Sequence, residues 1–136
     1  MAADLYIHIL EGVTEDDIKR FEGNTIGSKY FGTPCTDEEW DVIDRKLAKT
    51  PAVWVGEVSW LKAALLDDND TYIPAPVMAV SEAIGEDFPV IDDELIGKVR
   101  DALAKPNQTG YKVNDPTEVL AFLMKHKGKK CFTIAW

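Results

Sequence analysis

The chain has 136 residues and a mass of 15.2 kDa, a length typical of one domain. Hydrophobic residues make up 46% and charged residues 29% of it, which fits a globular protein and excludes a disordered chain or a collagen-like repeat. The 24 acidic and 15 basic side chains give a formal net charge of −9. A field of this sign repels phosphate backbones, so we expect no direct binding of nucleic acid.

The cysteine content and the N-terminus predict the compartment. Cys35 and Cys131 lie far apart in the sequence, and neither belongs to a close cysteine pair. A secreted chain of this length usually carries several disulfide-bonded cysteines, so we predict two free thiols in a reducing compartment. The first residues lack the basic and apolar regions of a secretory signal. No apolar run reaches the roughly 20 residues of a membrane helix. We therefore expect a cytoplasmic protein without a membrane segment.

Three segments have the composition of β-strands. Residues 4–10, 52–58 and 130–136 are rich in β-branched and aromatic side chains. In the first segment Leu5 and Ile7 alternate with Tyr6 and His8, so both faces of the strand can be covered. We expect the first and last strands to pair with each other and the middle strand to join them.

Capping signals in the sequence predict where several helices begin. Thr14 precedes three acidic residues, Thr36 opens a capping box with Glu39, and Asp115 precedes a proline at the first helical position. Asp92 is a fourth cap, with an apolar stripe after it. Together with the apolar spacing, these signals predict six helices, over residues 14–22, 37–49, 59–65, 76–84, 92–103 and 115–127.

The interleaved elements predict an α+β fold. We expect a single domain over residues 1–136, with about six helices packed on a small mixed sheet of three or four strands, its terminal strands paired. No repeat, low-complexity segment or linker divides the chain. Residues 23–35, which include Tyr30 and Phe31, form the longest segment without a clear period. Long irregular loops often carry function, although a plain connection is the more common case.

No motif for a metal or a nucleotide is present. The histidines and cysteines lack the close ligand pairs of zinc sites. The acidic turn at 67–70 lacks the glycine and the glutamate that an EF-hand loop places at its sixth and twelfth positions. The glycines at 23 and 27 are not followed by a clear helix start, which a phosphate-binding loop needs. We expect no metal and no cofactor.

One carboxylate is a candidate for acid–base chemistry. Glu57 lies within an apolar strand, where a carboxylate needs a partner or a raised pKa. If the first and middle strands are neighbours, His8 could be that partner. Three interpretations stay open: an acid–base pair, a structural ion pair, or a glutamate on a solvent-facing side of the sheet.

The size and charge favour an acidic protein-interaction domain. Inhibitors, immunity proteins and phage-type modulators of basic partner proteins share these properties. The surface that we expect to bind includes residues 23–35 and the acidic residues of the helices predicted over 14–22 and 37–49. The candidate residues are Tyr30, Phe31, Asp37, Glu38 and Asp41. The alternative is a small enzyme or small-molecule binder centred on Glu57 and His8. A third hypothesis is a structural subunit that forms a homo-oligomer.

Overall fold

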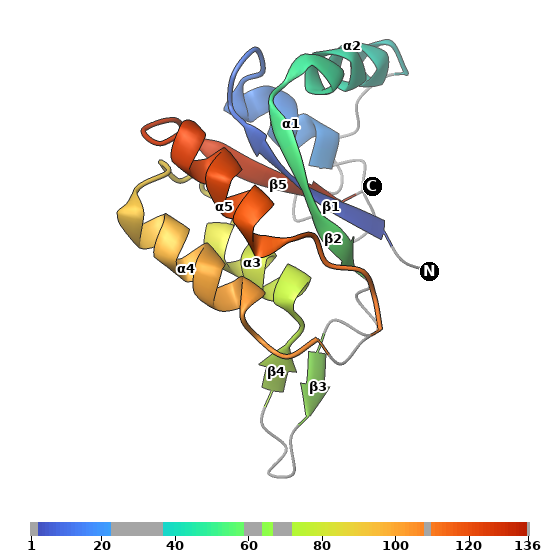
Figure 1. The fold of residues 1–136 in the computed structure, drawn as a ribbon. Coiled ribbons are helices and arrows are strands. Elements are labelled where there is room, and N and C mark those ends of the chain that lie inside the picture. The colour runs from blue at the N-terminus through green and yellow to red at the C-terminus, as the bar shows by residue number, and fades with distance from the viewer. Residues whose placement is uncertain (1–2, 23–36, 59–63, 67–71, 108–109, 136) are drawn as a thin grey trace. The chain divides into compact units, whose positions relative to one another are not determined.

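The computed structural model describes residues 3–22, 37–58, 64–66, 72–107 and 110–135 (Figure 1). Contacts along the chain group it into two compact units. Unit 1 consists of Met1–Ile9 and Ala52–Trp136, and unit 2 is Leu10–Pro51. Unit 2 is therefore inserted between the first two strands of unit 1.

A three-stranded antiparallel sheet forms the centre of unit 1. Its strands are β1 (Ala3–Ile9), β2 (Ala52–Val58) and β5 (Cys131–Ala135), in the order β2-β1-β5. Residues Ile9 and Cys131 are register partners, so the predicted pairing of the terminal strands is confirmed. The predicted mixed sheet is wrong, because both pairings are antiparallel, and no fourth strand of the described chain joins them.

Three helices belong to unit 1: α3 (Pro76–Ile84), α4 (Asp93–Leu103) and α5 (Pro116–Lys125). Both α3 and α5 contact β2, and α4 contacts α3 and α5 (Figure 1). Two of their starts have the predicted caps. The Asp92 carboxylate accepts from the backbone N–H of Leu95 at 2.8 Å, and the Asp115 carboxylate accepts from Thr117 N–H at 2.9 Å. These bonds satisfy amides that the helices themselves leave unpaired.

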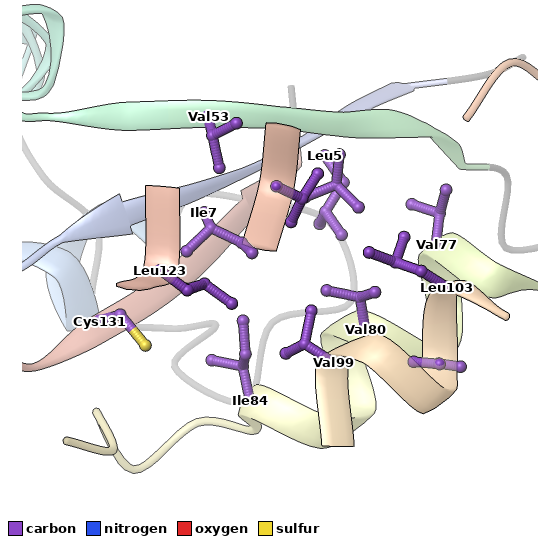
Figure 2. Close-up of a cluster of buried hydrophobic side chains, with 14 of the residues drawn as sticks. Leu5, Ile7, Val53, Val77, Val80, Ile84, Val99, Leu103, Leu123 and Cys131 are labelled. Atoms are coloured by element: carbon purple, nitrogen blue, oxygen red, sulfur yellow. The ribbon is translucent and has the colours of Figure 1, made fainter. Parts of the chain in front are cut away.

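One face of the sheet and the three helices enclose the main hydrophobic core (Figure 2). Leu5 and Ile7 contribute from β1, Val80 from α3, Val99 from α4 and Leu123 from α5. Each of these side chains is at most 2% exposed. All members of this core belong to unit 1, so its apolar burial stabilises the sheet and its covering helices as one body.

A second, two-stranded sheet replaces part of a predicted helix. Strands β3 (Ala64–Leu66) and β4 (Tyr72–Pro74) pair antiparallel, with Leu65 opposite Ile73. The prediction of a helix over 59–65 is therefore wrong at its C-terminal end, and residues 59–63 lie outside the described residues. A helix this short gains little stability by itself, so pairing with a β-favouring segment decides the structure. The described chain contains five helices where about six were predicted.

Unit 2 contains the other two helices, α1 (Glu15–Glu22) and α2 (Asp37–Lys49). At the start of α1, the Thr14 hydroxyl accepts from Asp17 N–H and the Asp17 carboxylate accepts from Thr14 N–H, both at 3.1 Å. The same carboxylate lies 3.1 Å from Lys46 Nζ of α2. The predicted cap at Thr14 is confirmed, and its partner Asp17 also connects the two helices.

Candidate functional site

The structure does not bring Glu57 and His8 together. Glu57 of β2 is the register partner of Asp4, whereas His8 is the partner of Ala52 at the other end of the strand pair. The rise of a β-strand is about 3.4 Å per residue, so the distance along β1 from Asp4 to His8 is roughly 14 Å. The predicted partnership of Glu57 and His8 is therefore wrong, because the register separates them although the strands are neighbours.

Glu57 bonds to a backbone segment instead. Its N–H donates to Lys112 O at 2.8 Å, and its carboxylate Oε1 accepts from Lys112 N–H at 3.1 Å. Two residues further along the same segment, Asn114 N–H donates to Val55 O at 2.9 Å. The half-buried carboxylate thus helps to hold residues 112–114 along the outer edge of β2.

His8 lies in an apolar setting. Its side chain is 5% exposed, and its ring is stacked on Phe132 at 5.4 Å between centroids, with Tyr6 at 6.2 Å. Within the described part of the chain, neither ring nitrogen has a hydrogen-bond partner. Burial lowers the pKa of His8 from 6.5 to about 4. At neutral pH the ring is an uncharged member of an aromatic stack, and no hydrogen-bond partner among the described residues receives or supplies a proton.

Two of the three acidic residues predicted on the second helix are exposed. Glu38 and Asp41 both lie on the solvent side of α2, opposite the buried Ile43 and Leu47. Val42, beside Asp41, is 48% exposed. We call the exposed stripe of this helix the outer face of α2; it consists of Glu38, Asp41, Val42, Arg45 and Lys49.

The charges along α2 divide into two halves. The first half is acidic, with five carboxylates from Asp37 to Asp44, and the second half contains three cations from Arg45 to Lys49. This order agrees with the positive N-terminal and negative C-terminal ends of the helix dipole. Of the cations, Lys46 is paired with Asp17. The described residues provide no ion-pair partner for the charges of the outer face.

Several of the remaining candidate residues lie outside the part of the chain that the structure describes. Tyr30 and Phe31 lie outside the described residues, as does Cys35. Asp37 is the first residue of α2, and its side chain is outside the described part. The sequence prediction missed Val42 and the cations that share the outer face. The 3.6-residue period could have placed them beside Glu38, because positions 42, 45 and 49 are four, seven and eleven residues further on.

Cys131 is a free thiol, as predicted. It is fully buried, and burial raises the pKa of its thiol to about 12. Such a thiol carries essentially no thiolate at neutral pH, so it is a poor nucleophile. In the described ranges, no three histidine, cysteine, aspartate or glutamate side chains gather as metal ligands would. No helix in these ranges is long and apolar enough to span a membrane.

Exposed charge and an exposed apolar side chain thus coincide on the outer face of α2, as they also do on α5, where Met124 is 65% exposed beside the exposed Lys125. Glu57 and His8 each have a structural setting of their own, at opposite ends of the pairing of β1 and β2. Comparison of the chain with protein families, with curated proteins and with solved structures found no match.

Proposed function

We propose that the chain is a non-enzymatic protein-interaction domain that binds a basic partner protein through the outer face of α2. One observation carries this proposal: Glu38 and Asp41 are exposed beside Val42, itself 48% exposed, on one stripe of a helix. An inhibitor, an immunity protein or a phage-type modulator of a basic protein in the cytoplasm would use a surface of this kind.

The two components of the outer face would contribute differently to binding. Burial of Val42 against the partner removes apolar surface from water and so adds affinity. The carboxylates of Glu38 and Asp41, together with the net charge of −9, would speed the encounter with a basic surface and disfavour acidic partners. The Debye length is about 8 Å at physiological ionic strength, so binding should weaken as salt is added.

The test compares capture by three versions of the chain. The wild type, immobilised and exposed to cell lysate at low salt, should retain a basic protein that high salt releases. The double variant Glu38→Lys with Asp41→Lys should lose that protein. The matched control is Asp87→Lys with Asp101→Lys, which makes the same change in net charge at exposed positions of unit 1. This control should retain the protein, because only the general field of the chain is altered.

Equal capture by the α2 variant and the wild type would refute the proposal. Equal loss in both double variants would show that net charge, not the outer face of α2, determines binding. Because a lysine in the first turn of α2 opposes the helix dipole, circular dichroism must show unchanged helix content. Glu38→Gln with Asp41→Asn removes the charges at a smaller cost to the helix, and we expect it to weaken capture in the same direction.

A further inference from the structure

The outer face of α2 has the spacing of a helix–helix contact. Glu38, Val42, Arg45 and Lys49 are exposed and follow one another at intervals of four, three and four residues. In paired helices, the positions that contact the other helix are separated by alternating steps of three and four residues. The outer face of α2 has the same spacing. The opposite side of α2, with Ile43 and Leu47, is buried within the chain. The helix therefore has a buried face and a second, exposed seam.

The seam is complementary to itself when one copy is reversed. Positions 38 and 49 lie equally far from its middle, and so do positions 42 and 45. In an antiparallel pair, Glu38 of each copy faces Lys49 of the other, and Val42 faces Arg45. A parallel pair would instead place like charges at the same level, which is unfavourable.

We propose that the outer face of α2 binds the same face of a second copy of this chain, antiparallel and about a two-fold axis. This inference goes beyond the proposed function, because the second copy has the same net charge of −9 and is not a basic protein. The match is local: the basic second half of one α2 faces the acidic first half of the other. Two-fold contacts of this kind use one patch twice, so each favourable pair occurs twice.

The contacts expected at this interface are modest. The Val42 side chain would pack on the aliphatic stem of Arg45, whose charged group stays in water. Asp41 flanks the seam and adds a second carboxylate near Arg45. With 13 residues, α2 is about 20 Å long, so the contact belongs to the small and transient class of interfaces. We therefore expect a dissociation constant in roughly the micromolar to millimolar range.

Charge exchange between the two ends of the seam gives a sharp test. Sedimentation velocity should show concentration-dependent dimers for the wild type. Glu38→Lys alone should weaken dimerisation by about tenfold or more, since both pairs then join two cations. Lys49→Glu alone should weaken it similarly, since both pairs then join two anions. An equimolar mixture of the two single variants should dimerise again, because each cationic end now faces an anionic one.

Two further variants complete the design. The double variant Glu38→Lys with Lys49→Glu should dimerise like the wild type, and Asp101→Lys, an exposed position of α4, should not change dimerisation. A wild type that stays monomeric up to millimolar concentration would overturn the proposal, as would single variants that dimerise normally or a mixture without recovery. A monomeric wild type whose capture of a basic protein still depends on Glu38 and Asp41 would remove this inference and leave the proposed function in place.

Discussion

His8 is a buried residue whose pKa lies well below its ordinary value. A neutral imidazole has one N–H donor and one acceptor nitrogen, and in the described part of the chain neither has a partner. The stacked contact with Phe132 compensates in part for the lost hydration. Protonation would add a second unpaired donor and a buried charge, which explains why burial holds the pKa of His8 near 4.

This pKa makes the stability of the fold depend on pH. Between pH 6.5 and about 4 the unfolded chain binds a proton at His8 and the folded chain does not. The free energy of unfolding should therefore fall as the pH falls through this range, by up to about 3 kcal/mol from this residue. His8→Phe keeps an aromatic ring beside Phe132 and removes the titration. Urea unfolding at several pH values should show a smaller decline for the variant; an equal decline in both proteins would contradict the assignment.

Gly56 is required by a close approach of two segments. A Cβ atom built on it would lie 2.6 Å from Lys112 O and 2.7 Å from a methyl group of Val77. Its φ of +156° also disfavours other residues. Because the nearest obstacle is backbone, we expect Gly56→Ala to lower the free energy of unfolding by about 1–3 kcal/mol.

Gly97, within α4, is the matched control for this substitution. The nearest atom to a Cβ at Gly97 is Arg100 Nη2 at 3.6 Å, an ordinary contact. Alanine favours a helix more than glycine, so Gly97→Ala should raise stability by about 0.5–1 kcal/mol. Urea unfolding of both variants measures the two effects. Equal effects of the same sign would show that the contact with Lys112 does not constrain position 56.

At the scale of elements, the features that were predicted correctly from the sequence are those that local hydrogen bonds determine. The caps at Thr14, Asp92 and Asp115 each depend on a side chain and an amide at most three residues apart. Gly85, the residue directly after the helix predicted over 76–84, follows α3 with a φ of +69°. Such features are visible in a single sequence because every atom that they need lies within one turn.

The predictions that failed depend on distant segments. Nothing near Glu57 in the sequence specifies that it lies beside Asp4. The strands β1 and β2 are separated in the sequence by the whole of unit 2, and their register is irregular between Leu5 and Tyr6. Likewise, Ala64–Leu66 has residues that favour a helix, and its partner strand decides otherwise. The candidate site was predictable in its acidic residues, whose exposure follows from the helical period. The same period could have placed Val42 beside Glu38, and the structure adds that its side chain is 48% exposed.

The cap of α1 contributes to the stability of unit 2. Burial raises the pKa of Asp17, but the hydrogen bonds from Thr14 and Lys46 outweigh this effect and hold it below its ordinary value. Thr14→Ala removes the hydroxyl that accepts from Asp17 N–H. We expect a loss of about 1 kcal/mol, measured as faster amide hydrogen exchange in α1.

Thr117→Ala is the control for this cap. In the first turn of α5 it is the backbone N–H of Thr117, and not its hydroxyl, that bonds to the Asp115 carboxylate. The substitution should therefore leave exchange in α5 nearly unchanged. Similar protection of α1 in Thr14→Ala and the wild type would show that the cap contributes little there.

At the scale of the whole molecule, charge is distributed unequally. Residues 105–136 carry six lysines against two acidic residues, a net charge of +4 within a chain of −9. Part of this positive charge is compensated within unit 1, where Lys127 Nζ lies 2.6 Å from Asp93 Oδ1. The carboxylates of the outer face of α2 have no comparable compensation in the described chain. An unequal distribution of this kind favours one orientation when the chain meets a charged partner.

The arrangement of the two units also predicts which part of the chain is sufficient to fold. The main core draws every member from unit 1, and unit 2 enters between strands that are direct antiparallel neighbours. Replacing residues 10–51 by Asn-Gly-Lys would join β1 to β2 through a two-residue turn and keep His8 opposite Ala52. We expect this shortened chain to unfold cooperatively in urea with the same β1–β5 pairing, read from amide exchange. A shortened chain without protected amides in α3 and α5 would show that the core of unit 1 depends on residues 10–51.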